Sequence, residues 1–190
     1  EMCIRDSNRT IKLTENPKKN QNIRFKGEQI KKGDLILKKG SKINLGSIGY
    51  IMSLGISDIY VSKKPSISII ITGDELVSNG KQIELGQIYE SNSVMIKNCL
   101  IKEGINNLKI FKTKDNLELI SKRIKKEITK SDIIILSGGI SVGDYDFVRK
   151  ALKQNKIKQI FYKVKQKPGK PIWFGKKNSQ FAIALPGNPG

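Results

Sequence analysis

Residues 131–146 read SDIIILSGGISVGDYD, a run of apolar residues followed at once by a glycine-rich polar loop. The four apolar residues from Ile133 to Leu136 are typical of a strand that is buried on both faces. The ten residues after them contain three glycines, two serines and two aspartates. Consecutive glycines permit close backbone approach, and their N–H groups can face an anion. The stretch therefore predicts a buried strand that ends in a ligand-binding loop.

Extended and helical patterns alternate on both sides of this strand. Strands are predicted at residues 67–71, 107–111, 133–136, 159–164, 171–175 and 181–185, and helices at residues 93–103, 115–130 and 146–154. The last two strands are expected to form a hairpin through KKNSQ. Alternation from Ser66 onward predicts an α/β fold, a mostly parallel sheet between helical layers on both faces.

Three details of the helices can be predicted from their sequences. Gly104 is expected to end the first helix, and Asp115 is a candidate N-cap for the second. The buried stripe of the second helix is predicted to consist of Leu117, Ile120, Ile124 and Ile128. Cys99 lies in the apolar segment VMIKNCLI and is expected to be a reduced core thiol.

The N-terminal third of the chain has a weaker pattern. Residues 1–7, EMCIRDS, fit no period and are expected to be a non-native leader. Residues 8–64 are predicted to be an incomplete region of short extended segments, parted by glycine turns, with a helical pattern at LGSIGYIMSLGI. The α/β domain is expected to occupy residues 65–190.

Composition narrows the classes of function. The chain has 36 lysines and arginines against 17 acidic residues, a net charge of +19. The lysines are scattered and aromatic residues are not interleaved with them, which favours a solvated surface that attracts small anions over nucleic-acid binding. The absence of histidine excludes histidine catalysis and Cys/His zinc sites. No membrane span or signal peptide is recognisable, so a cytoplasmic protein is expected.

Three loops are predicted to meet at the carboxyl ends of the strands. They are TGDEL at residues 72–76, the glycine loop, and KVKQKPGKP at residues 163–171. Strand alternation would place Lys163, Lys165 and Lys167 on one side, where they suit a polyanion. Each loop also has a plainer interpretation, since acidic turns often cap helices, Asp146 can cap the next helix and most lysines are merely solvated.

The chemistry of these loops indicates one class of ligand. Carboxylates at Glu75, Asp115 and Asp146 accompany the lysines and the glycine loop. Oxygen ligands of this kind suit a hard cation such as Mg²⁺. The residues alone therefore predict a site for a phosphate-bearing ligand with Mg²⁺, and they do not identify the ligand further.

Five motifs, TGDEL, GQIYESN, SGGISVGDYD, KPGKP and LPGNP, occur in this order and resemble the molybdopterin molybdenumtransferase family of the MoeA type, which includes the gephyrin and Cnx E domains. The glycine loop differs from the TGGTG and TGGLGPT loops of the related adenylyltransferases and CinA-like proteins. The resemblance implies a molybdopterin-binding, MogA-like domain that inserts molybdate into adenylylated molybdopterin and releases AMP. It also implies Mg²⁺ and a homodimer.

The resemblance carries site roles onto residues of this chain. Catalytic roles fall on Glu75, Asp115, Asp146, Lys163 and Lys167, and the three carboxylates would also bind metal. Binding of the pterin nucleotide falls on Thr72, Gly73, Asp74, Ser137, Gly138, Gly139, Ser141, Gly143, Asp144, Lys170, Pro186, Gly187 and Asn188.

The chain departs from the family pattern in two respects. Gln29 stands in GEQ where the family has GED, so a carboxylate associated with activity is replaced. The N-terminal elements before Asn22 and the C-terminal β domain after LPGNP are missing, which makes a central substrate-binding domain the expected identity. The alternatives are a molybdopterin adenylyltransferase of the related fold and a non-catalytic molybdopterin-binding or scaffold module.

Overall fold

The protein is described by a computed structural model that covers residues 16–140 and 146–187. The chain forms two compact units, Glu1–Tyr60 and Val61–Gly190. Each unit is considered by itself below. No helix in the described part of the chain is both long enough and apolar enough to span a bilayer.

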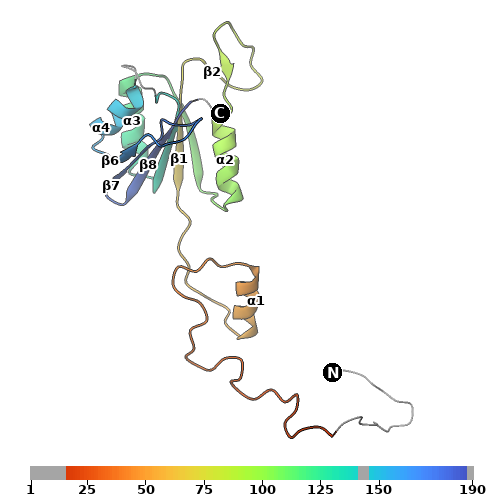
Figure 1. Ribbon diagram of the computed structural model, residues 1–190. Coiled ribbons are helices and arrows are strands. Elements are labelled where there is room, and N and C mark those ends of the chain that lie inside the picture. The colour runs from red at the N-terminus through yellow and green to blue at the C-terminus, as the bar shows by residue number, and fades with distance from the viewer. Residues whose placement is uncertain (1–15, 141–145, 188–190) are drawn as a thin grey trace. The chain divides into compact units, whose positions relative to one another are not determined.

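In the first unit, described from residue 16 onward, a series of turns leads to helix α1 (Leu45–Ser53) (Figure 1). Asn44 caps this helix by accepting a hydrogen bond from the Ser47 amide at 2.9 Å. The extended segments that the sequence predicted form no strand between residues 16 and 60. Local turns replace them, with amide-to-carbonyl bonds from Asp34 to Lys31 and from Ser41 to Lys38. A strand needs a partner for its backbone groups, and residues 16–60 provide none.

The second unit is built on a six-stranded sheet with the order β4-β1-β5-β8-β7-β6. The strands are β1 (Ile67–Thr72), β4 (Leu108–Thr113), β5 (Ile133–Ser137), β6 (Lys158–Tyr162), β7 (Trp173–Lys177) and β8 (Gln180–Leu185). Strands β4, β1, β5 and β8 are parallel, whereas β7 runs antiparallel to both of its neighbours. The predicted mostly parallel α/β sheet and its terminal hairpin are thus confirmed.

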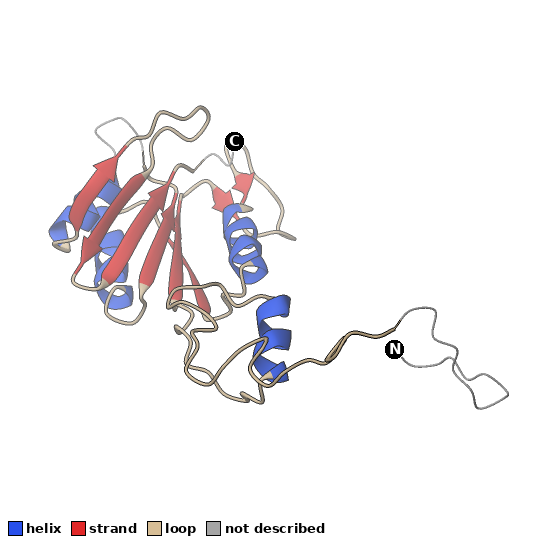
Figure 2. Ribbon diagram, turned by 60° about the horizontal axis from the view of Figure 1, so that its bottom comes forward, coloured by secondary structure: helices blue, strands red, loops and turns tan. Residues whose placement is uncertain are grey.

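Helices cover both faces of the sheet (Figures 1 and 2). They are α2 (Asn92–Lys102), α3 (Leu117–Glu127) and α4 (Phe147–Gln154). Ile69 and Ile71 of β1 pack in one apolar cluster with Ile96 of α2. Ile70 points the other way, into a cluster with residues of α3 and α4. Successive side chains of a strand alternate between faces, so an unbroken apolar run is what two helical layers require.

The ends and faces of the helices partly follow the sequence. Ile120, Ile124 and Ile128 are buried as predicted, and Gly104 lies just beyond α2 with a φ of +74°. The prediction that Asp115 caps α3 is wrong, because Asn116 accepts from the amides of Glu118 and Leu119, at 3.0 and 3.1 Å.

The predicted burial of Cys99 is also wrong, since the thiol is exposed. The buried side of α2 carries Ser93 and Ile96. Cys99 follows Ile96 by three residues, but the stripe continues through Leu100, which packs on the inner cluster. Periodicity could not separate these two adjacent positions, because both carry apolar side chains.

A second, two-stranded sheet follows the first strand. It pairs β2 (Leu76–Val77) with β3 (Ile88–Tyr89) in parallel. The sequence pattern did not predict these strands, because two residues are too short to show a period of two. The pair holds together the segment between the TGDEL and GQIYESN motifs.

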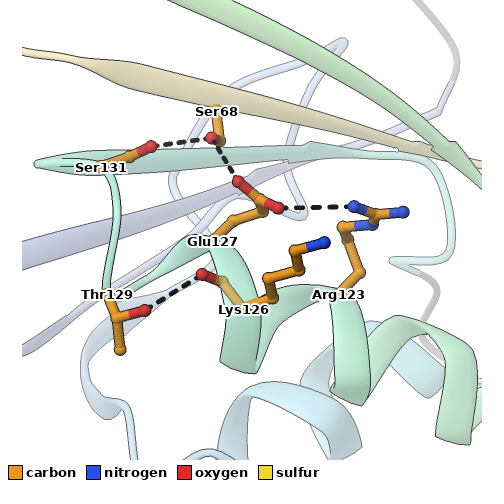
Figure 3. A network of polar contacts seen from close by, with 6 residues as sticks. All are labelled: Ser68, Arg123, Lys126, Glu127, Thr129 and Ser131. Carbon is orange, nitrogen blue, oxygen red and sulfur yellow. Dashed lines mark hydrogen bonds and ion pairs between the residues drawn. The ribbon is translucent and has the colours of Figure 1, made fainter.

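A buried carboxylate ties α3 to the amino end of the sheet (Figure 3). Glu127 is 2% exposed and lies 3.4 Å from Nη1 of Arg123. Ser68 donates to the other carboxylate oxygen at 3.3 Å, and its hydroxyl is 2.7 Å from that of Ser131. Arg123 also lies over the ring of Phe111, 4.5 Å from its centroid. The network joins the end of α3 to β1 and to the residue pair that precedes β5.

We expect Arg123→Met to destabilise the second unit by about 3 kcal/mol, because the buried Glu127 carboxylate loses its positive partner. The free energy of unfolding in urea would measure this. Lys122→Met is the matched control, since Lys122 is exposed on the same helix. Equal stability of the two variants would contradict the prediction.

Candidate functional site

The loops of the predicted site follow adjacent strands but lead to helices on opposite faces of the sheet. The loop after β1 leads toward α2 on one face, whereas the loop after β5 leads to α4 on the other. Since β1 and β5 are adjacent and parallel, both loops begin at the same edge of the sheet and then diverge to opposite faces. Such a topological switch point is where open α/β sheets bind ligands.

Gly138 brings the ends of β1 and β5 into close contact. A Cβ at this position would overlap the carbonyl oxygen of Thr72, and the backbone φ is +91°. A Cβ on Gly187, after β8, would lie 3.3 Å from the Cα of Gly138. Three of the predicted motifs therefore meet at Gly138, which contacts Thr72 on one side and Gly187 on the other.

Two oxygen atoms converge beside Gly139. A Cβ on this glycine would lie 2.8 Å from Oγ1 of Thr72 and 3.2 Å from Oδ1 of Asp115. Both oxygens are buried, and neither has a hydrogen-bond partner in the described part of the chain. Buried oxygens without partners are uncommon in folded proteins, because each has lost its hydrogen bonds to water without gaining new ones. A polar ligand, a cation or a water molecule in this position would complete them.

Acidic neighbours affect Asp115. Burial raises the pKa of its carboxyl above the ordinary 3.8, and the charges of Asp74 and Glu75 raise it further. Its amide also donates to Oδ1 of Asp74 at 3.2 Å. The structure thus brings three predicted site residues, Asp74, Glu75 and Asp115, into one region of negative charge, which a cation would relieve.

The fit of Mg²⁺ to this region can be tested on its donor atoms. No group of three or more carboxylate, thiol or imidazole side chains lies close enough to hold a metal among residues 16–140 and 146–187. Mg²⁺ is commonly held by one or two carboxylates together with substrate phosphates and water, so a complete protein cage is not required. The oxygen-only donors and the unpartnered Oδ1 of Asp115 are compatible with that mode of binding.

Asp146 is engaged differently. It is 4% exposed and caps α4, where Oδ1 accepts from the Arg149 amide at 2.9 Å. Oδ2 lies 3.5 Å from Nη1 of Arg149. Burial raises the pKa of Asp146, and the bonds and charge of Arg149, together with the charge of Lys150, oppose that rise. Its side chain lines a cavity of about 520 Å³ with Arg149, Lys150 and Lys153.

The lysine motif lies in a loop. Strand β6 ends at Tyr162 and β7 begins at Trp173, so strand alternation does not align Lys163, Lys165 and Lys167, and that prediction is wrong. Prolines and Gly169 interrupt the extended pattern, and Lys163 has a φ of +69°. Nζ of Lys163 lies 5.1 Å from the Tyr162 ring centroid. Lys165, Lys167 and Lys170 line a cavity of about 630 Å³ within the loop.

The remaining predicted residues divide between two further cavities. Gly73 and Asp74 line one of about 300 Å³ together with Lys112 and Lys114. Ser137 and Pro186 line another of about 220 Å³. Four predicted residues, Ser141, Gly143, Asp144 and Asn188, lie outside the described residues.

Asn92 contacts two of the site's motifs and was not predicted. Its amide nitrogen donates to Oγ of Ser137 at 2.9 Å and to the carbonyl oxygen of Gly187 at 2.8 Å. The GQIYESN motif contained this residue, but an asparagine at the start of a helix is usually a cap. Here Glu90 occupies that role, since it accepts from both the amide and the hydroxyl of Ser93.

Comparison with known protein families identifies the fold and the motifs. A family described as a probable molybdopterin binding domain matches residues 68–190, and one described as the MoeA N-terminal region (domain I and II) matches residues 1–55. The chain belongs to the molybdopterin-binding domain family. The resemblance to the MoeA type that the five motifs predicted is thereby confirmed.

Individual proteins similar to this chain carry the name molybdopterin molybdenumtransferase or MoeA. A molybdopterin molybdenumtransferase of Haemophilus influenzae is 39% identical over 181 residues, which are 95% of this chain and 44% of that protein. One from Staphylococcus aureus is 38% identical and covers 90% of this chain and 41% of its own length. A crystal structure of the molybdopterin biosynthesis MoeA protein of Pyrococcus horikoshii matches with a TM-score of 0.68 and 27% identity, over 86% of this chain and 40% of that one. This chain thus spans less than half the length of these curated relatives.

We expect Gly138→Ala to destabilise the second unit by roughly 3 kcal/mol or more, because strain at positive φ adds to overlap with the Thr72 carbonyl. Gly86→Ala is the matched control, since Gly86 has a φ of +85° and nothing within 4 Å of an added Cβ. That control should cost only about 1–2 kcal/mol. Urea denaturation of both variants measures the difference, and equal losses would argue against the close contact.

We expect Asp115→Asn to raise the Tm at neutral pH. A raised carboxyl pKa means that the native state holds the proton more tightly than the unfolded chain. The ionised group therefore destabilises the fold above this pKa, and stability falls as pH rises from 3.8 through the raised value.

The difference in Tm between this variant and the parent should vanish below pH 3.8, grow as the pH rises through the raised pKa, and stay constant above it. Thermal melts across that range, with the exposed Asp58→Asn as control, provide the measurement. A difference that is independent of pH would rule out charge on Asp115 as the cause.

Proposed function

We propose that this chain supplies the substrate-binding part of a molybdopterin molybdotransferase. The reaction inserts molybdate into adenylylated molybdopterin and releases AMP, in the biosynthesis of molybdenum cofactor. The names of the relatives support this activity. The observation that carries it is the convergence of Thr72, Gly138 and Gly187, from three of the motifs, at the switch point of the sheet.

The phosphate groups of the ligand are assigned to the glycine loop. Gly138 and Gly139 let the loop pack directly against Thr72, whose hydroxyl lies beside Gly139. Lys112 and Lys114 line the neighbouring cavity with Gly73 and Asp74, where they can balance negative charge. The net charge of +19 favours the encounter with an anionic substrate.

Asp115 and Glu75 are the residues that would hold Mg²⁺, with Asp74 beside them. The cation would neutralise charge on the phosphate groups as AMP departs. Asp115 would also orient the water that releases AMP, and its Oδ1, which has no partner in the described part of the chain, supports this role. Asp146, whose oxygens both contact Arg149, would act through charge at the far side of the glycine loop.

The lysines of the 163–171 loop are assigned to anion binding. Lys167 and Lys170 share one cavity, so they can hold molybdate or a phosphate between them. Lys163 follows β6 directly and contributes positive charge near Tyr162. A homodimer, which the family resemblance implies, and a cytoplasmic location complete the proposal.

The test is release of AMP from adenylylated molybdopterin in the presence of molybdate and Mg²⁺. Because this chain spans less than half of its relatives, the assay uses both the chain and a chimera in which it replaces the matching region of the Haemophilus influenzae protein. Production of AMP-linked pterin from ATP and molybdopterin would instead indicate an adenylyltransferase. Binding without either reaction in the chimera would indicate a scaffold module.

We expect Asp146→Asn in the chimera to lower AMP release at least about tenfold, since it removes a buried charge beside the site. The fold should persist, because asparagine caps a helix as well as aspartate does. Asp58→Asn is the control, and a thermal melt verifies folding. If the folded Asp146→Asn variant released AMP at the parental rate, Asp146 would serve only as a helix cap.

A further inference from the structure

The cavity of about 220 Å³ differs in chemistry from the rest of the site. Its walls include Met95, Ile96, Pro168 and Pro186, and no charged side chain occurs among its described lining residues. Pockets for a whole ligand usually measure about 300–1,000 Å³. This smaller, largely apolar cavity therefore suits one uncharged end of a ligand and is unsuited to a phosphate or molybdate group.

The orientation of the Asn92 amide follows from its partners. The carbonyl oxygen of Gly187 can only accept a hydrogen bond, so the nitrogen of Asn92 must face it. That places Oδ1 on the opposite side of the amide. Oδ1 is buried and has no partner in the described part of the chain, although Asn92 lines the cavity.

A structural role explains the bonds of the Asn92 amide nitrogen but not the burial of its amide oxygen. Clamping of the loops after β5 and β8 accounts for the two bonds from the nitrogen. Capping of α2 is performed by Glu90 through Ser93. Neither role uses Oδ1, and a buried acceptor without a donor is costly unless a ligand supplies one.

Ser137 complements this acceptor. Its Oγ accepts from Asn92, which leaves its own proton to donate. The side chains of Asn92 and Ser137 thus offer an acceptor and a donor next to each other. A heterocycle whose edge carries an N–H group beside a ring acceptor matches this pair, and both a pterin and an adenine have such an edge.

We infer that Asn92 is a specificity-determining residue, whose Oδ1 accepts a hydrogen bond from an N–H group of the ligand's heterocyclic ring in this cavity. The inference rests on the proposed function, because that function supplies the ring as part of adenylylated molybdopterin. The phosphate groups would then extend from the cavity toward Thr72 and Gly138, and Gly138 packs against Gly187, which Asn92 holds.

The test compares ligands that differ only in the donor. One pair is pterin and the pteridine that lacks its exocyclic amino group, and the other is AMP and purine riboside monophosphate. The parent chain should bind the amino-bearing member of one pair about tenfold more tightly. The pair that shows this preference identifies the ring that enters the cavity.

Asn92→Ala should abolish this preference. Asn98→Ala is the matched control, because Asn98 is exposed on the same helix, and it should keep the preference. Thermal melts and circular dichroism verify that both variants fold. The measurement on the parent chain stands even if Asn92→Ala does not fold.

Three outcomes would overturn the inference: no preference in either pair with the parent chain, no binding of any of the four probes, or equal weakening of both members by Asn92→Ala. The last would mean that Asn92 is only a clamp between loops. AMP release by a protein that shows no preference would leave the proposed function intact. A preference without AMP release would support the role of Asn92 and contradict the proposed function.

Discussion

At Gly138, directly after β5, the backbone lies so near the end of β1 that one added carbon would overlap the Thr72 carbonyl oxygen. This approach is possible because β1 and β5 are adjacent parallel strands whose loops leave toward opposite faces. It brings Thr72, Gly139 and Asp115 together and lets the loop after β8 rest on Gly138. The remaining site residues surround this close backbone contact, which only glycine permits at position 138.

The main features of the fold could be predicted from the sequence because their signals are long and redundant. The isoleucine run from Ile69 to Ile71 indicated a strand with a helical layer on each side, and all six residues of β1 are buried. The stripe of Ile120, Ile124 and Ile128 recurs at helical spacing. Errors arose where one or two residues decide the outcome: Asn116 caps α3 in place of Asp115, and prolines turn the lysine segment into a loop.

The candidate site could be located from the sequence, but its bonding could not. The motifs indicated that the loops after β1 and β5 hold the ligand, and the topology brings them to one edge. No pattern shows that Asp115 Oδ1 and Thr72 Oγ1 lack partners, because that depends on how three distant loops pack. Asn92 escaped notice for the same reason: its partners are 45 and 95 residues away in the chain.

Asn92 begins α2, which covers one face of the sheet, whereas the glycine loop leads into α4 on the other face. A ligand held by both is a cross-link between the two outer layers of the domain. Its arrival would therefore suppress independent opening of α2 and α4, so that amide hydrogens in these helices exchange together and more slowly. The layered fold thus makes occupancy of a small site at one edge of the sheet detectable in helices on both faces.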